Sequence, residues 1–393
     1  MCIRDRYTKE EEEFRQKLCK FLDENLTEEV ARENWEDLGL KETGREFAKK
    51  MAANGFLGMS WPKEYGGQGL PPNYEFILLD ELGMRWGAHV PNDIGYTMVG
   101  HTILRRGSEE LKKELLPGVV AGELEFCLGY SEPNAGSDLA SLKMKAVRDG
   151  DDYIINGQKT FNTECHYSDY HWLAVRTDSD PSKPAYKGIS LFVVDQNAPG
   201  IDIRPMICMS GEQTNEVYYE DVRVPASRMV GEENKGFYYV MEALGSERNQ
   251  VFVPSRLRPI LNHSITYAKN TEFNGKPLSE DPATRAQIAQ AAMEIEVAEM
   301  LAGHSRWMEL TEQKMSHEPE LCKVFTSELQ QRIANMGMDV LGMYSQLEEG
   351  SLDAPEDGRI EWHWLHSFVC TLGGGTSEIG RNIIAQRGLG LPR

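Results

Sequence analysis

A glutamate on an apolar helix face is the residue in this sequence best suited to acid–base chemistry. Apolar residues recur at helical spacing after Gly236, and Glu247 lies three residues after Leu244 and four before Val251 on the same stripe. The stripe also includes Phe237, Val240 and Met241. Burial disfavours a charged carboxylate, so the pKa of Glu247 is predicted to rise toward a value useful to a general base. A second interpretation is a structural glutamate paired with a distant basic residue.

Two further segments place small polar side chains next to an aromatic ring. They are residues 128–138 (LGYSEPNAGSD) and 152–163 (DYIINGQKTFNT). A planar cofactor such as a flavin needs hydrogen bonds at its polar edge and a flat apolar wall, and these residue types supply both. Taken alone, residues 133–136 equally fit a tight turn between strands, and a core position is a second interpretation of Phe161.

Length, composition and charge restrict the class of protein. The chain has 393 residues, of which 40% are hydrophobic and 26% charged, so we expect a globular protein of two or three packed units. The net charge of -20 argues against nucleic acid as a partner. No apolar run approaches the roughly 18 residues of a membrane span, and no secretory signal is recognisable, so we expect a soluble, cytoplasmic protein.

The cysteines predict neither a disulfide framework nor a metal site. There are seven of them, an odd number, and no two form a CxxC pair. We therefore expect no zinc or other metal, and each cysteine is interpreted as an ordinary core or surface residue.

The order of patterns along the chain predicts an α+β multidomain protein. Helical periodicity fills an N-terminal helical domain (7–122), short β-rich runs form a central β-barrel or sandwich domain (123–235), and helices return in a C-terminal four-helix bundle (236–393). The β runs are 172–176, 189–194 and 217–224. Turns are expected at Asp149-Gly150 and Asn156-Gly157.

The quoted segments resemble the flavin-contacting signature of the acyl-CoA dehydrogenases. The resemblance extends along nearly the whole chain, through residues 61–67 (WPKEYGG), 188–194 (GISLFVV), 221–225 (DVRVP) and 373–379 (GGGTSEI). It implies the fold of that family and FAD as cofactor. The implied flavin-contacting residues are Tyr130, Ser131, Ser137, Phe161, Thr163, Thr376 and Glu378. The family commonly has tryptophan where this chain has Phe161, which keeps the ring but loses the indole donor.

The resemblance also implies the reaction and the place of its base. An acyl-CoA dehydrogenase removes the α-proton of a thioester while the β-hydrogen leaves as hydride to the flavin. Many relatives carry the base just before a Gly-Thr pair, where this chain has Gly374. A second subset carries it on a helix before an arginine, which matches Glu247 and Arg248 here. Glu247 is therefore the expected base, and Ser137, Gly374 and Arg248 are expected at the acyl-CoA substrate, although Arg248 also fits a surface residue.

Part of the family pattern is missing, and this predicts a partner chain. Residues 267–275 lack the arginine that homo-oligomeric relatives offer to the flavin pyrophosphate, and Asp339 would repel that group. These departures resemble the catalytic subunits of heteromeric dehydrogenases acting on steroid side chains. We therefore expect a hetero-oligomer with a second acyl-CoA dehydrogenase-like chain, a branched or polycyclic acyl group, and an electron-transfer flavoprotein as oxidant.

Three alternatives stay open at this point. A homodimer or homotetramer could hold FAD through Arg285 or Lys269. The chain could instead be a noncatalytic subunit of a heteromeric complex, an idea suggested by the altered half-site. It could also keep the fold and perform other flavin chemistry, such as a lyase reaction or nitroalkane oxidation.

Overall fold

The computed structural model describes residues 7–36, 41–85, 93–250 and 253–392, without the side chains of residues 34–36 and 246–250. The chain folds into two compact units. The bundle unit comprises Met1–Leu22, Pro72–Ala88 and Arg248–Arg393, and the sheet unit comprises Asp23–Pro71 and His89–Glu247. The predicted succession of a helical N-terminal part, a middle β domain and a helical C-terminal part is confirmed, whereas the exact domain boundaries stay a prediction.

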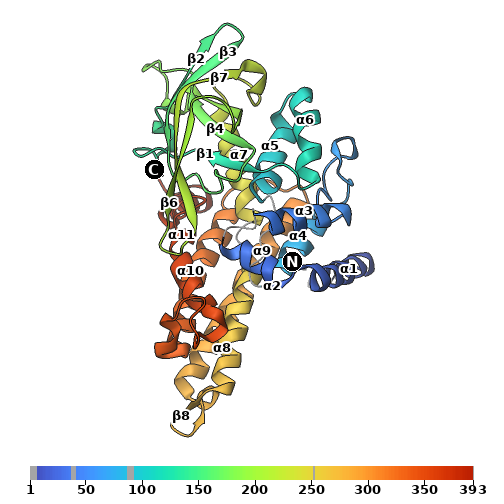
Figure 1. The fold of residues 1–393 in the computed structure, drawn as a ribbon, viewed down its shortest axis with the longest axis vertical. Coiled ribbons are helices and arrows are strands. Elements are labelled where there is room, and N and C mark those ends of the chain that lie inside the picture. Colours follow the sequence, from blue (N-terminus) through green and yellow to red (C-terminus); the bar gives the residue numbers. More distant parts are fainter. Residues whose placement is uncertain (1–6, 37–40, 86–92, 251–252, 393) are drawn as a thin grey trace. The chain divides into compact units, whose positions relative to one another are not determined.

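The sheet unit is built on one seven-stranded mixed sheet (Figure 1). Its strands follow the order β1-β4-β2-β3-β7-β6, and β5 pairs with β4. The strands are β1 (Phe126–Gly129), β2 (Lys145–Asp149), β3 (Asp152–Lys159), β4 (Tyr170–Arg176), β5 (Ile189–Asp195), β6 (Ile201–Ile207) and β7 (Gln213–Pro225). The helices of this unit are α2 (Glu28–Glu36), α3 (Glu42–Ala53), α5 (Gly100–Arg106), α6 (Glu109–Val120) and α7 (Gly236–Gln250, as far as Glu247).

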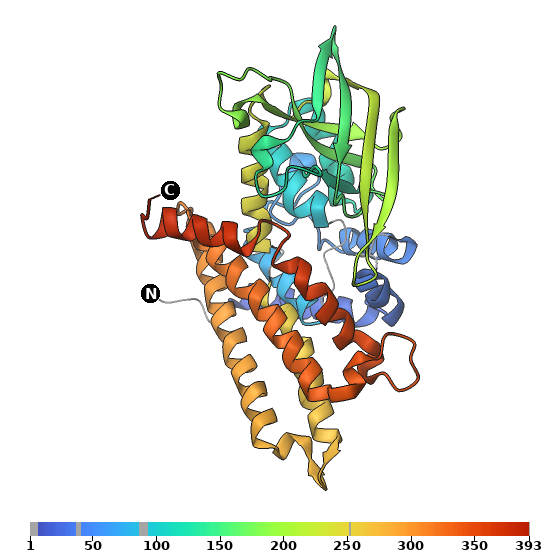
Figure 2. The ribbon, with the colours of Figure 1, turned by 90° about the vertical axis from the view of Figure 1, so that its left-hand side faces the viewer.

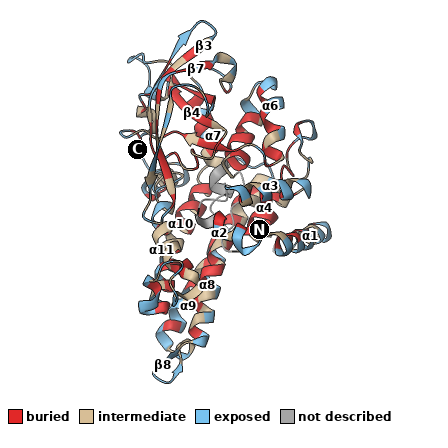
Figure 3. Cartoon of the chain, in the orientation of Figure 1, coloured by how far each residue is buried: buried red, intermediate tan, exposed pale blue. Residues whose placement is uncertain are grey.

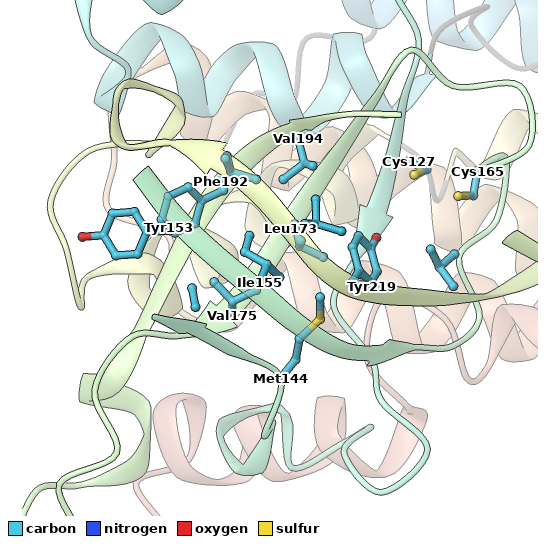
Figure 4. Packing of buried hydrophobic residues seen from close by; sticks show 14 residues of the cluster. Cys127, Met144, Tyr153, Ile155, Cys165, Leu173, Val175, Phe192, Val194 and Tyr219 are labelled. Atoms are coloured by element: carbon cyan, nitrogen blue, oxygen red, sulfur yellow. The ribbon is translucent and has the colours of Figure 1, made fainter. Parts of the chain in front are cut away.

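The predicted β runs all lie within strands, and burial explains why they could be recognised. Strands β4 and β5 are buried almost continuously, so they read as unbroken apolar runs, and Figure 3 shows buried positions along β4 and β7. The core between the strands includes Ile155, Leu173, Phe192 and Tyr219 (Figure 4). Packing of such residues stabilises the sheet by about 25 cal/mol per Å² of apolar surface buried.

One of the two predicted turns is wrong. Gly150 has a φ of 64° in the β2–β3 hairpin, as expected, but β3 continues through Asn156 and Gly157. The register with β7 shifts there, and Gly157 has a φ of 147°, so the pair forms a β-bulge. The Asn156 side chain holds Asp221 across the bulge, donating to its carboxylate at 3.0 Å and accepting from its backbone N–H at 2.9 Å.

The bundle unit packs long helices around one apolar core. Figure 2 shows α8, α9, α10 and α11 running beside one another, and their shared core includes Leu261, Ile295, Leu329 and Ile360. The helices of this unit are α1 (Lys9–Asn25, as far as Leu22), α4 (Asn73–Gly83), α8 (Arg258–Asn270), α9 (Pro282–Leu310), α10 (Glu318–Leu341), α11 (Arg359–Cys370) and α12 (Ser377–Ile383), with a hairpin of β8 (Glu272–Phe273) and β9 (Lys276–Pro277). None of the helices in the described ranges is long and apolar enough to cross a membrane.

A two-pronged ion pair joins α4 to α9 in the bundle unit. Arg306 donates from Nη1 and Nη2 to the two carboxylate oxygens of Asp80, at 2.7 and 3.0 Å. The guanidinium also lies 4.9 Å from the centre of the Phe76 ring. The Arg306 side chain is only 14% exposed, so this contact is shielded from water more than an ordinary surface pair.

We predict that Asp80→Asn destabilises the bundle unit by about 2–3 kcal/mol, because a shielded guanidinium loses its charge-assisted partner. Urea denaturation followed by circular dichroism measures the loss. The matched control is Glu294→Gln, which breaks a 3.0 Å pair with Arg332 whose arginine is 46% exposed. That change should cost less than about 1 kcal/mol. Equal losses in both variants would contradict the argument.

Candidate active site

The first part of the candidate site is the segment that leaves strand β1. Tyr130 follows β1 directly and is buried, and its hydroxyl accepts a hydrogen bond from Trp172 Nε1 at 2.9 Å. Trp172 lies on β4, directly opposite Leu128 of β1. The parallel pairing of the two strands therefore fixes where Tyr130 sits.

A buried ion pair between Lys159 and Glu132 also holds the segment that follows β1. Lys159, at the end of β3, is fully buried, and its Nζ donates to the Tyr130 carbonyl and to Glu132 Oε1, both at 3.0 Å. Burial lowers the pKa of Lys159 to about 8, although the neighbouring Glu132 opposes the shift. The Glu132 carboxylate also accepts the backbone N–H groups of Lys143 at 2.7 Å and Met144 at 2.9 Å. Neither partner was recognised from the sequence, because 27 residues separate them.

Phe161 presents an apolar ring at the surface beside this segment. Phe161 is 67% exposed, and its backbone φ of 58° is unfavourable for a residue with a Cβ atom. Thr160, next to it, donates its backbone N–H to the Ser131 carbonyl at 3.0 Å. Two residues later, the Thr163 hydroxyl lies 3.4 Å from that of Thr214. An exposed ring on a strained backbone is typical of a binding surface rather than of a core position.

The structure therefore brings four of the predicted flavin residues into one region of the sheet unit. Tyr130, Ser131, Phe161 and Thr163 come from the ends of β1 and β3, which the Lys159 contacts and the Thr160–Ser131 hydrogen bond join. Ser137 lies exposed in the loop that follows Ala135.

Asn162, between two predicted flavin residues, carries an unused polar group. The residue is fully buried, and within the part of the chain described neither its side-chain oxygen nor its nitrogen has a hydrogen-bond partner. Its backbone N–H donates to the Asn215 carbonyl at 3.0 Å, and its own carbonyl accepts from Asn215 Nδ2 at 2.8 Å. The main chain is thus held firmly while the amide is left unpaired, a cost that native structures tolerate mainly at functional or strained places.

Two buried carboxyl groups, those of Glu125 and Glu164, lie close in sequence to the predicted flavin residues. Burial raises the pKa of Glu125 to about 8, Arg45 opposes this rise, and Asp169 adds to it. Burial also raises the pKa of Glu164 well above its usual range, with a further contribution from Glu125. With a pKa of about 8, Glu125 is predicted to be largely protonated at neutral pH, so it can donate a hydrogen bond. Sequence patterns did not reveal these two groups, because no helical or strand periodicity marks either position.

The remaining predicted cofactor residues belong to the bundle unit. Thr376 caps helix α12, accepting the backbone N–H of Ile379 at 3.2 Å, and Glu378 is exposed in the first turn of that helix. Gly374 and Gly375 precede the cap with φ values of 65° and 97°, which glycine adopts at no steric cost. These residues thus belong to a different compact unit from Tyr130 and Phe161.

The predicted base lies on a helix whose side chains are only partly described. Helix α7 includes Glu247 and Arg248, but their side chains lie outside the described residues. The stripe predicted for α7 needs a correction, because Met241 is 39% exposed, whereas Tyr239, Val240 and Ala243 are buried. The buried face is thus shifted by about one position from the predicted one. Residues on one face of a helix recur every three to four positions, so the predicted and the observed buried faces of α7 share Val240.

Two residues that bear on the predicted pyrophosphate site, Asp339 and Arg285, make contacts within the bundle unit. Asp339, on α10, accepts a hydrogen bond from Gln287 Nε2 at 3.4 Å, and Arg285 donates from Nη1 to the Ser279 carbonyl at 3.2 Å. Both residues project from exposed parts of the bundle unit. Arg285, in the first turn of α9, is therefore hydrogen-bonded to the segment just before that helix.

Comparison with known proteins identifies the family. Three family descriptions match: "Acyl-CoA dehydrogenase, N-terminal domain" at residues 8–123, "middle domain" at 127–222 and "C-terminal domain" at 234–389. The chain is 36% identical over 399 residues to acyl-CoA dehydrogenase FadE26 of Mycobacterium tuberculosis, covering 100% of this chain and 99% of that protein. The chain belongs to the acyl-CoA dehydrogenase family and is an oxidoreductase.

Two solved structures of heteromeric members are similar over the whole chain. The ChsE4-ChsE5 complex from Mycobacterium tuberculosis matches at 37% identity with a TM-score of 0.89, covering 99% of this chain and 100% of that one. The Tcur3481-Tcur3483 steroid acyl-CoA dehydrogenase matches at 32% identity with a TM-score of 0.89, covering 100% of both chains. The resemblance inferred from the sequence is thereby confirmed, and members of this family generally bind FAD.

We predict that Glu125→Gln stabilises the protein at pH 8 and that the gain shrinks toward pH 5. Glu125 loses its proton near 4.5 when unfolded and near 8 when folded, so the parent loses stability as pH rises through this window. The slope is at most about 1.4 kcal/mol per pH unit. Glutamine keeps the shape without the charge and avoids this loss.

Denaturation midpoints of parent and variant between pH 5 and 8.5 give the measurement. Glu123→Gln, two residues away and exposed, is the control and should leave the pH dependence unchanged. A constant difference between parent and Glu125→Gln over this range would show that the carboxyl group does not titrate as argued.

Proposed function

We propose that the chain catalyses FAD-dependent α,β-dehydrogenation of an acyl-CoA thioester with a bulky, steroid-like acyl group. The observation that carries the proposal is the exposed Phe161 ring, held on a strained backbone between Ser131 and Thr163. Its surroundings fit a flavin, because the ring supplies a flat wall and the flanking hydroxyls supply hydrogen bonds. The similarity to a steroid acyl-CoA dehydrogenase supports the choice of acyl group.

In this proposal the sequence-predicted residues divide between the flavin and the acyl-CoA, and Ser137 serves both. The proposed flavin-contacting residues are Tyr130, Ser131, Ser137, Phe161 and Thr163 of the sheet unit and Thr376 and Glu378 of the bundle unit. Bound FAD supplies the acceptor for the β-hydrogen. Arg248 binds the CoA nucleotide through its positive charge, and Ser137 and Gly374 adjoin the acyl thioester.

Glu247 is the proposed base that removes the α-proton. It follows Ala243 by four residues and Val240 by seven, and both of these residues are buried on α7. The position at which other members of the family carry their base is Gly374, which has no side chain to accept a proton. A glutamate at an apolar helix face has the raised proton affinity that the reaction needs.

We further propose that this chain works with a second acyl-CoA dehydrogenase-like chain. Because residues 267–275 lack an arginine and Asp339 is acidic, a second copy of this chain would not offer the usual arginine to the pyrophosphate of the flavin. The similarity to the ChsE4-ChsE5 complex supports this arrangement. An electron-transfer flavoprotein is the proposed oxidant, and the cytoplasm the proposed location.

We predict that Glu247→Gln slows bleaching of the flavin by a steroid-side-chain acyl-CoA by about 10²–10⁴-fold, the usual contribution of a general base. Flavin content should stay that of the parent. Stopped-flow absorbance of the complex purified with its partner measures the rate.

Glu242→Gln is the matched control on the same helix. Glu242 pairs with Arg105 at 3.0 Å and Arg106 at 3.1 Å and is not one of the proposed flavin or substrate residues, so its loss should leave bleaching intact. An unchanged rate in Glu247→Gln would remove this residue from the mechanism. In that case a noncatalytic subunit, which the altered half-site also fits, becomes the better account.

We also predict that the chain purified alone holds clearly less than one FAD, and that adding its native partner restores full occupancy. The physical reason is the repulsion between Asp339 and a pyrophosphate, with no arginine in 267–275 to offset it. Absorbance of released flavin, together with mass spectrometry of the co-purified partner, measures both quantities. Stoichiometric FAD on the isolated chain would instead support a homodimer or homotetramer.

A further inference from the structure

Three side chains that can bind a metal meet in the core of the sheet unit. They are Cys127, Cys165 and His171, whose ligand atoms all lie within 4.8 Å of one another. Each residue is fully buried. Figure 4 shows the sulfur atoms of Cys127 and Cys165 next to each other in the packed core. Three soft or imidazole ligands in one buried place are typical of a structural zinc site.

The strand pairing explains how separate segments deliver these ligands. Cys127 on β1 lies directly opposite His171 on β4 in the parallel ladder. Cys165 lies in the connection between β3 and β4, six residues before His171. The sequence predicted no zinc site because its ligands share no short spacing motif. The site depends on the β1–β4 register.

The distances around His171 fit tetrahedral coordination. Nε2 lies 3.5 Å from Cys165 Sγ and 3.3 Å from Gln196 Oε1. A zinc ion with bonds of about 2.3 Å to sulfur and about 2.0–2.1 Å to nitrogen and oxygen places such ligand pairs about 3.5 and 3.3 Å apart at tetrahedral angles. The carboxamide oxygen of Gln196 thus lies at the distance from Nε2 that a fourth ligand would have.

The second nitrogen of the same imidazole also has the partner expected beside a metal. His171 Nδ1 lies 2.5 Å from the hydroxyl of Tyr219, which is itself buried on β7. A metal-bound histidine usually donates its other N–H to an oxygen, which fixes the ring orientation. Charge favours the ion as well, because two thiolates balance a divalent cation and leave the apolar core neutral.

We propose that Cys127, Cys165 and His171, completed by Gln196, bind one zinc ion that cross-links the sheet. Cys127 lies three residues before Tyr130, and Cys165 lies two after Thr163. The ion therefore ties together the two segments that carry the candidate flavin residues. Its role is structural, since all four ligands are supplied by the protein and three of them are fully buried.

The same contacts could form a metal-free hydrogen-bond network, in which Tyr219 donates to Nδ1 and Nε2–H is shared between Gln196 and Cys165. The experiment must therefore detect the ion itself. The untagged full chain, expressed with zinc and then passed through metal-free buffer, is analysed by inductively coupled plasma mass spectrometry. Expression with cobalt in place of zinc adds an optical readout, the thiolate-to-cobalt charge-transfer absorption.

We predict one zinc per chain in the parent and in the control Cys322→Ala, a buried cysteine of the bundle unit. Cys165→Ser should lose the zinc and the cobalt absorption. Tyr219→Phe, which keeps the ring and removes only the supporting oxygen, should bind zinc about 10-fold more weakly. This second variant keeps the test valid if Cys165→Ser does not fold.

Three results would overturn the proposal. The first is a parent chain without zinc or cobalt whose cysteines all react as free thiols after unfolding. The second is a disulfide between Cys127 and Cys165. The third is a folded Cys165→Ser variant that retains the full metal content, which would place the ion elsewhere.

Discussion

The candidate site depends on one buried charge, the ammonium group of Lys159. Removing an ammonium from water costs several kcal/mol even after relaxation, and only well-placed partners offset that cost. Here Glu132 and the Tyr130 carbonyl provide them at 3.0 Å, and Glu132 is itself held by two backbone N–H groups. The ends of β1 and β3 and the start of β2 are therefore joined through one salt bridge. Loss of either charged partner would leave the other buried and unpaired.

This anchoring allows the strained conformation of Phe161. A positive φ at a residue with a side chain persists only when the flanking chain is fixed on both sides. On one side the fixed residues are Lys159 and Thr160, and on the other Asn162 is bound twice to Asn215 through its main chain. The ring can then stay at the surface although it would be more stable in the core. The strained backbone and the exposed ring of Phe161 therefore have the same cause, which is the anchoring of the residues on either side.

The sequence predicted the elements better than the contacts between them. Runs such as 189–194 were recognised because a strand buried on both faces consists of apolar residues only. Asn156-Gly157 was misread because the pair fits both a hairpin turn and a bulge, and the choice depends on Asp221 of a distant strand. Glu125, Lys159 and the Cys127–His171 pair escaped recognition for a similar reason. Their chemistry arises from register and burial, which no local pattern encodes.

The glycines before α12 link the conformation of the chain to the place of its base. Gly374 and Gly375 both adopt positive φ, and an L-residue in the left-handed region costs about 1–2 kcal/mol. A glutamate at Gly374 would therefore strain this turn in the conformation that it has here. Because this chain has glycine at that position, the proposed base comes from another element. A helix with a buried face, such as α7, can supply a carboxylate without a strained backbone, and this is the physical reason to prefer Glu247.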